Sequence, residues 1–136
     1  MAGGDLTRGR HRSRTTWHAR PGAGGSKAAA LELAQFNGEV LYASGETALY
    51  AGVEVIDFSD EREAFEGSIV IVLRDGSIST QRIAGRVTVR QDMQRVSGVG
   101  TWQFITGTGR FAGLTGGGTF TWSADGDDYA SEFKGE

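Results

Sequence analysis

The chain has 136 residues, enough for one domain with a buried core, and its 22 glycines against a single proline favour tight turns over long helices. It contains no cysteine, which excludes a disulfide framework and a thiolate zinc site. No run approaches the roughly 18 apolar residues of a membrane-spanning helix, and the apolar core of a secretory signal is missing. We therefore expect a cytoplasmic protein with no membrane partner.

Charge is distributed unevenly along the chain. Residues 1–27 carry six basic side chains and one acidic side chain, whereas the remainder carries eight basic and sixteen acidic ones. A basic segment on an acidic body is compatible with nucleic-acid contact, but the body lacks the basic patch that strong phosphate binding needs. We expect no nucleic-acid partner.

Residues 1–27 show no hydrophobic periodicity and consist mainly of Gly, Arg, Ser and Thr. Because this composition does not offset the entropy of ordering, we predict a flexible basic arm over 1–27 and one domain over 28–136. An alternative is that the arm folds over a cavity mouth as a lid, with Trp17 as its anchor. His11 and His18, the only histidines, both fall in the arm, so we expect no Ser–His or metal–His site in the domain.

The next segments are typical of strands. Leu31 and Leu33 alternate with Glu32, which predicts a strand continuing to about Tyr42, although the good helix formers in 28–35 leave a short helix as the alternative. After a turn at 44–46, residues 47–58 form a long alternating strand. Its two faces carry Leu49, Ala51, Val53 and Val55 on one side and Tyr50, Glu54 and Ile56 on the other.

Residues 64–90 contain a hairpin signal, Asp75-Gly76 between two apolar runs. Pairing about a two-residue turn sets Leu73 opposite Ile78 and Ile69 opposite Arg82, on the more apolar face that we assign inward. Arg82 is then inward, and a bulge near residues 84–85 is needed to restore the register beyond it.

An inward arginine needs a partner because burial of an unpaired charge is costly, and Glu54 has the right side-chain parity. Arg82 and Glu54 are our candidate catalytic residues, with the arginine holding a substrate carbonyl, enolate or carboxylate. The alternative is a structural ion pair at the rim of the fold.

The stretch 98–122 is a glycine-punctuated strand–loop–strand unit, and a last strand follows at 129–133. Its glycines are turn residues rather than a phosphate loop, because no helix follows them. Large aromatic side chains alternate along these strands and either fill a core or form the wall of a ligand cavity. Glycines 116–118 support the cavity because they leave room beside large rings. The candidate substrate-binding residues are Trp102, Phe104, Phe120, Trp122, Tyr129 and Phe133, together with Tyr50.

Seven or eight short strands with no confident helix leave a sandwich or a closed barrel as the fold. Antiparallel neighbours, a bulge and abundant glycine favour an all-β, up-and-down antiparallel barrel. A barrel of this size has just enough interior for side chains or for one small ligand.

The run Thr-Gly-Arg-Phe-Ala-Gly-Leu-Thr-Gly at 108–116, between the strand from Thr101 and the strand at Phe120, resembles the allene oxide cyclase–dirigent barrel superfamily. Residues 109–116 are most similar to its bacterial branch, which includes spirotetronate cyclases (Diels–Alderases). The resemblance covers residues 98–122 and is compatible with the layout of 46–90.

This resemblance implies an all-β, eight-stranded antiparallel calycin-like barrel with an apolar cavity and no cofactor, assembled as a homodimer or homotrimer. Phe120 matches an aromatic that lines the cavity of the spirotetronate cyclases. Gly118 stands where at least one such enzyme has an arginine, and no motif here matches the surroundings of the plant cyclase's catalytic glutamate.

We therefore expect a cofactor-independent cyclase or isomerase that folds an apolar polyene or polyketide-type intermediate for Diels–Alder-like ring closure, with Arg82 or a tyrosine hydroxyl polarising a carbonyl. The alternatives are a non-catalytic, dirigent-like binder of a small lipophilic molecule, and an oligomeric structural barrel with a filled core. Interior volume separates them, since ligand pockets begin at about 300 Å³.

Overall fold

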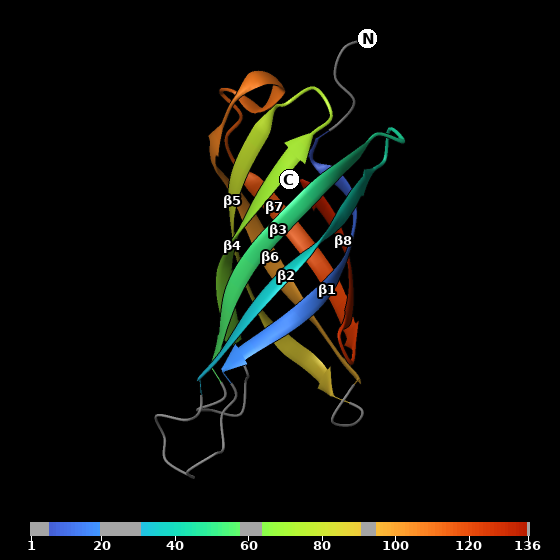
Figure 1. The fold of residues 1–136 in the computed structure, drawn as a ribbon, viewed down its shortest axis with the longest axis vertical. Coiled ribbons are helices and arrows are strands. Elements are labelled where there is room, and N and C mark those ends of the chain that lie inside the picture. Colours follow the sequence, from blue (N-terminus) through green and yellow to red (C-terminus); the bar gives the residue numbers. More distant parts are fainter. Residues whose placement is uncertain (1–5, 20–30, 58–63, 91–94, 136) are drawn as a thin grey trace.

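The protein is an all-β barrel of eight strands (Figure 1). The computed structural model describes residues 6–19, 31–57, 64–90 and 95–135. The strands are β1 (Arg8–Ala19), β2 (Leu31–Tyr42), β3 (Thr47–Asp57), β4 (Ala64–Leu73), β5 (Ile78–Arg90), β6 (Arg95–Gly107), β7 (Gly117–Asp125) and β8 (Asp128–Gly135).

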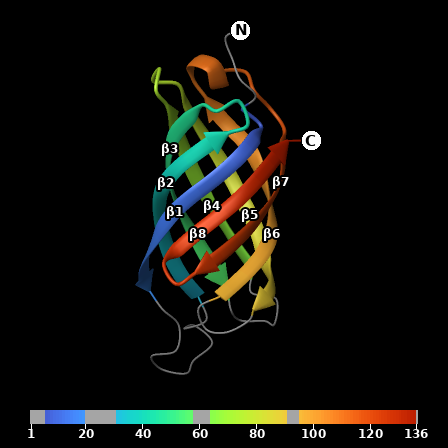
Figure 2. The same cartoon turned by 90° about the vertical axis from the view of Figure 1, so that its right-hand side faces the viewer.

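Every strand pairs antiparallel with its neighbour in sequence, and β8 pairs with β1 to close the barrel (Figure 2). The predicted eight-stranded antiparallel barrel is thus confirmed, and residues 31–42 form a strand rather than a helix. Within the described ranges, the only helical element is a single 3-10 turn at Gly109–Phe111. None of the described helical segments is long and apolar enough to cross a membrane.

The prediction of a flexible arm over 1–27 is wrong for residues 8–19, which form β1. This strand pairs with β2 from Gly9 to Ala19 and with β8 from Arg8 to Arg14, so the backbone of these residues forms the barrel wall and not a lid. Residues 1–5 and 20–27 of the predicted arm lie outside the described residues. The low apolar content misled the prediction because β1 is held by backbone pairing on both edges, which composition does not reveal.

The predicted register of the β4–β5 hairpin is wrong by one residue. Val72 pairs with Ile78, and the loop has three residues because Gly76 N–H donates to Leu73 O and Leu73 N–H donates to Ser77 O. Only the glycine of this loop has a positive φ, at 91°, as in a type I turn followed by a glycine bulge.

A one-residue slip exchanges the two faces of a strand, so Gln81 points inward and Arg82 outward. Every second side chain from Ser79 to Val87 then faces the interior, so the bulge that we predicted at residues 84–85 is not needed. The register shifts of β5 against β6 lie instead at Thr80/Gln81 and Val87/Val89.

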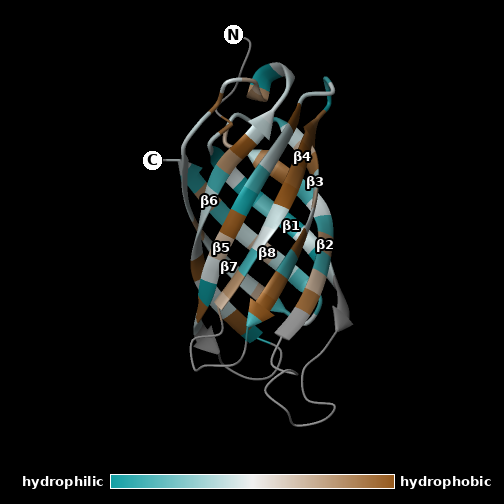
Figure 3. Ribbon diagram, turned by 90° about the vertical axis from the view of Figure 1, so that its left-hand side faces the viewer, coloured by the Kyte–Doolittle hydropathy of each residue, from teal (hydrophilic) through white to brown (hydrophobic). Residues whose placement is uncertain are grey.

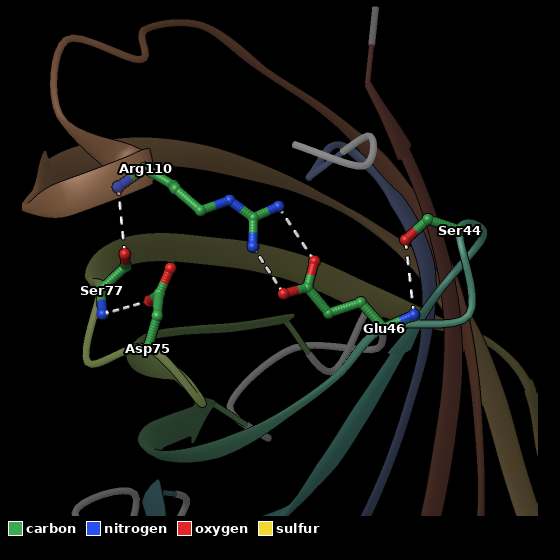
Figure 4. A network of polar contacts seen from close by, with 5 residues as sticks. All are labelled: Ser44, Glu46, Asp75, Ser77 and Arg110. Atoms are coloured by element: carbon green, nitrogen blue, oxygen red, sulfur yellow. Dashed lines mark hydrogen bonds and ion pairs between the residues drawn. The ribbon is translucent and has the colours of Figure 1, made fainter. Parts of the chain in front are cut away.

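The loop after β6 caps one end of the barrel (Figure 4). Phe111 in the 3-10 turn is almost fully buried, with its ring centroid 6.4 Å from that of Phe104. The Arg110 guanidinium donates to both carboxylate oxygens of Glu46, at 2.5 and 2.9 Å, and its backbone N–H donates to Ser77 Oγ at 3.0 Å. This cap therefore joins the β2–β3 turn, the β4–β5 turn and the β6–β7 loop.

Candidate functional site

A polar cluster lies inside the barrel, among aromatic side chains. It comprises His11 and Ser13 of β1, Tyr50 and Glu54 of β3, and Tyr129 and Ser131 of β8, hereafter the interior polar cluster. The strand register brings its members together, because His11 pairs with Ser131 and Ser13 pairs with Tyr129. Gly38 of β2 lies between Ser13 and Tyr50 in the same row, and a side chain there would collide with the β1 backbone.

His11 is the central member of the cluster. Its Nδ1 lies 2.9 Å from Ser131 Oγ, and its ring stacks on Phe133 at 4.6 Å and contacts Tyr50 at 4.7 Å between centroids. Its Nε2 is buried and has no hydrogen-bond partner among the described residues. Burial lowers the pKa of His11 from 6.5 to about 4, so the imidazole is neutral at physiological pH.

The two tyrosines of the cluster are also held in their neutral form. Burial is the main cause that raises the pKa of Tyr50, and the Glu54 carboxylate acts in the same direction, while the Ser13 hydroxyl opposes it. Burial likewise raises the pKa of Tyr129 far above its ordinary value, with Glu54 and Tyr50 adding to the effect. Both phenols are therefore available as hydrogen-bond donors.

A small closed cavity of about 20 Å³ adjoins the cluster. A volume of this size is about what one water molecule requires. Trp102 contributes an indole N–H that, like His11 Nε2, is buried without a partner in the described part of the chain. The lining side chains are His11, Phe36, Tyr50, Ile69, Gln81, Ile83, Trp102, Phe120, Tyr129 and Phe133.

Elsewhere in the described interior, aromatic rings lie over inward-facing glycines. A Cβ on Gly100 would come within 2.4 Å of the Phe120 ring, and one on Gly98 within 2.7 Å of the Trp122 ring. The space left by missing side chains is thus occupied by rings. Glycines 116–118, which we expected to leave room for a ligand, do not line the closed cavity: Gly116 is a turn residue with φ of 86°, and the other two abut neighbouring backbone.

The predicted aromatic residues all belong to the interior. Tyr50, Trp102, Phe104, Phe120, Trp122 and Phe133 are buried, and Tyr129 is half-buried and packs against them. Five of the seven line the closed cavity, whereas Phe104 packs toward the cap and Trp122 packs against Phe65 and Tyr129. The alternation of side chains along each strand was sufficient to predict that these aromatic residues face the interior.

The predicted catalytic pair is not formed. The Arg82 side chain is 63% exposed on the outer wall and pairs with Glu66 at 3.1 Å. It points away from Glu54, which is half-buried on the inner face of β3. The cause is the three-residue turn, which shifts the pairing of β5 with β4 by one residue from the predicted register. Arg82 is therefore removed from the candidate site, and Glu54 stays as a neighbour of both buried tyrosines.

His11, Ser13 and Ser131 are the members that sequence reasoning missed. A signal was present, since Arg8, Arg10, Arg12 and Arg14 alternate with Gly9, His11 and Ser13, the period of a strand with one exposed face. The pattern was hidden because its inward residues are small or polar rather than apolar.

Two larger depressions lie on the outer wall, with volumes of about 1000 and 1350 Å³. Their linings combine exposed and inward residues: the first includes Ser13 and Tyr129 of the interior polar cluster, and the second includes the buried Phe120 and Phe133. Among the described residues, no three His, Cys, Asp or Glu side chains are grouped to hold a metal ion.

Comparisons with protein-family models, curated proteins and solved structures gave no match to this chain.

Proposed function

We propose that the protein is a cofactor-independent isomerase or cyclase of a small, largely apolar molecule, with His11 as the proton-transfer group. One observation supports this above all: a neutral imidazole, anchored through Nδ1 to Ser131, presents an unpartnered Nε2 beside the closed cavity. An unpartnered buried polar group costs about 1–3 kcal/mol, and a polar group of a ligand bound beside Nε2 would remove that cost.

The cluster supplies the groups that proton transfer next to a carbonyl requires. When Nδ1–H donates to Ser131 Oγ, Nε2 holds a lone pair and accepts the proton of a C–H bond, whose electron pair moves toward the carbonyl oxygen. The neutral phenols of Tyr50 and Tyr129 are suited to donate hydrogen bonds to that oxygen as it gains negative charge. Return of the proton to another carbon completes an isomerisation.

For ring closure of a polyene, the aromatic wall is the important part. Side chains such as Phe120 and Trp102 would hold the chain in a folded conformer, which lowers the barrier without a titrating group. The cavity of about 20 Å³ is far below the 300 Å³ or so of a ligand pocket, so binding of a substrate within it requires rings to move.

That small volume favours a second candidate, a filled barrel with a structural role. A lipophilic binding protein without catalysis is the intermediate case. The three functions differ in what they do with a conjugated lipid, which provides the test.

The experiment uses trans-parinaric acid, whose fluorescence increases in apolar surroundings and whose ultraviolet absorbance is lost when its conjugated double bonds isomerise out of conjugation or close a ring. An enzyme binds the probe and bleaches its absorbance catalytically, a binder gives only fluorescence, and a filled barrel gives neither. Where the bleaching is an isomerisation by proton transfer, His11→Gln should lower its rate by about 100-fold, the usual size of an acid–base contribution. Ring closure through folding of the substrate does not use His11, and its rate should be unchanged in this variant. Arg82→Met on the outer wall is the matched control and should leave both signals unchanged. Binding without bleaching would contradict catalysis on this probe, and no binding would favour the filled barrel.

A further inference from the structure

Four aromatic rings follow one another around the inside of the barrel. Hydrophobic and hydrophilic residues alternate along several strands (Figure 3), and these rings belong to the inward set. The ring centroid of Tyr129 of β8 lies 6.3 Å from that of Phe36 of β2 and 6.0 Å from that of Trp122 of β7. Trp122 in turn lies 5.7 Å from Phe65 of β4. The plane of Tyr129 is within 24° of the planes of Phe36 and Trp122, so the faces of these three rings point in similar directions.

One carboxylate, that of Glu54, completes the circle of rings. Glu54 lies on β3, which runs between the strand of Phe36 and the strand of Phe65. It is on the inner face, and it adds to the effect of burial in raising the pKa of Tyr129, so the carboxylate and the phenol are close to one another. We call this set the aromatic collar: Phe36, Glu54, Phe65, Trp122 and Tyr129.

The residues beside Glu54 in the sheet are small. Its cross-strand neighbours are Ala34 on β2 and Gly67 on β4. Side chains that are directly opposite one another on neighbouring strands are the ones that would cover a carboxylate, and here they amount to a methyl group and a hydrogen atom. The sheet therefore leaves the Glu54 carboxylate open to a group that approaches along the inside of the barrel.

The collar can be reached from the end of the barrel opposite the cap. Inward residues next to the cap, such as Tyr42, Leu73 and Phe111, are almost fully buried. Glu54 and Tyr129 are only half-buried. The aliphatic side chains that face inward at the uncapped end are partly buried as well, namely Ile56, Val87, Val96 and Ala124. A ligand that enters at this end meets the collar first.

Aromatic rings and a carboxylate together recognise a positively charged organic group. The face of an aromatic ring attracts an ammonium ion whose centre lies within about 6 Å of the ring centroid, and tryptophan is the strongest such partner. The carboxylate attracts the same ion, whereas it repels a carboxylate or phosphate of a ligand. His11, further inside, is neutral and does not compete with a cation.

We propose that the aromatic collar binds the ammonium group of an apolar amine, which enters at the end of the barrel opposite the cap. Glu54 balances the charge, and the rings surround the substituents on nitrogen. Phe36 and Tyr129 also line the closed cavity, so the apolar part of the ligand lies toward His11. For the reaction proposed above, this names the substrate class as an apolar carbonyl compound that carries a protonated amine. That last step rests on the proposed function, whereas binding at the collar does not.

Two ligands of the same shape test the charge requirement on the full chain. Choline and 3,3-dimethylbutan-1-ol differ in that choline has a cationic nitrogen where the alcohol has a carbon atom. Titrations are followed by NMR through the backbone amide signals of the collar residues. We expect the dissociation constant of choline to be at least about 10-fold lower than that of the alcohol. Equal dissociation constants, or no binding of choline, would overturn the proposal.

Two pairs of variants assign the site. Glu54→Gln keeps the shape of the side chain and removes its charge, so it should raise the dissociation constant of choline by about 10-fold and leave that of the alcohol unchanged. Glu66→Gln, at an exposed glutamate of the outer wall, is the matched control and should change neither. Trp122→Phe keeps a ring of weaker attraction for cations and should also weaken choline binding, whereas Trp102→Phe, outside the collar, should not. Unchanged choline binding in both Glu54→Gln and Trp122→Phe would overturn the collar as an ammonium site.

The ammonium site and the proposed function fail separately. Choline binding by a protein that does not bleach trans-parinaric acid supports the collar and contradicts catalysis on that probe. Bleaching that depends on His11, in a protein that binds choline no better than the alcohol, overturns the collar alone.

Discussion

The imidazole of His11 carries no charge in the folded protein because it is buried against Phe133 and Tyr50, and among the described residues Ser131 is its one hydrogen-bond partner. Its location could not be inferred from residue type, since a histidine among arginines and glycines resembles a residue of a solvated tail. Pairing of Gly9 with Phe133 and of Ser13 with Tyr129, residues far apart in sequence, carries His11 into the interior. The position of Glu54 could be predicted from the sequence alone, because the alternation of side chains along β3 places it on the inner face.

Burial of His11 makes stability depend on pH. The pKa of His11 is about 4 in the folded protein against an ordinary 6.5, so the unfolded chain takes up the proton first as the pH falls. The free energy of unfolding therefore decreases through this window, by about 2 kcal/mol between pH 7 and pH 5 from this residue alone.

Urea unfolding at both pH values, for the wild type and for His11→Gln, measures this term. The variant has no group that titrates at this position and should lose that part of the pH dependence, whatever its absolute stability. Most carboxylates with ordinary pKa values are still ionised at pH 5, so they contribute little to the change in the free energy of unfolding between pH 7 and pH 5. Equal pH dependence of the two proteins would show that His11 is not buried in its neutral form.

At the scale of single elements, the length of a hairpin loop decides which side chains of the next strand face the interior. The sequence pair Asp75-Gly76 correctly indicated a turn, yet the loop also includes Arg74, and this one residue determines whether Gln81 or Arg82 faces the interior. Local propensity does not separate two-residue from three-residue loops when both place a glycine at positive φ. The β7–β8 hairpin was simpler, because two residues separate Asp125 from Asp128.

The cap after β6 is stabilised mainly by one side chain. Phe111 is 1% exposed, so Phe111→Ala should lower the free energy of unfolding by about 3–5 kcal/mol. Leu114→Ala in the same loop removes an exposed side chain and should change it by less than about 1 kcal/mol. Denaturant unfolding of both variants provides the comparison, and similar losses would mean that Phe111 does not close the barrel.

At the scale of the whole molecule, closure by β1 is what makes this sheet a barrel. β1 contacts both β2 and β8, so it removes the two edges that a seven-stranded sheet would expose. The same closure brings the members of the interior polar cluster together, since they come from β1, β3 and β8. It also places the arginines of β1 on the outer wall.

Deletion of residues 1–19 tests the importance of closure. A flexible arm could be removed without effect, whereas loss of β1 leaves β2 and β8 unpaired and should abolish cooperative thermal unfolding. Circular dichroism melts and size-exclusion chromatography of the truncated chain report the result. A synthetic peptide of residues 6–19 should restore the transition by pairing with both edges. A truncated protein that melts like the full chain would refute a structural role for β1.

The sequence by itself determined the all-β class, seven of the eight strands, the positions of the turns and the inward positions of the aromatic side chains. These follow from alternation with a period of two and from glycine at turn positions, which are local properties of the backbone. Only the tertiary structure decided that β1 closes the barrel, that Arg82 points outward, and that rings over glycines leave a closed cavity of about 20 Å³. Those outcomes depend on pairing and packing between residues that are distant in sequence, and the free energies of such contacts cannot be inferred from a local sequence pattern.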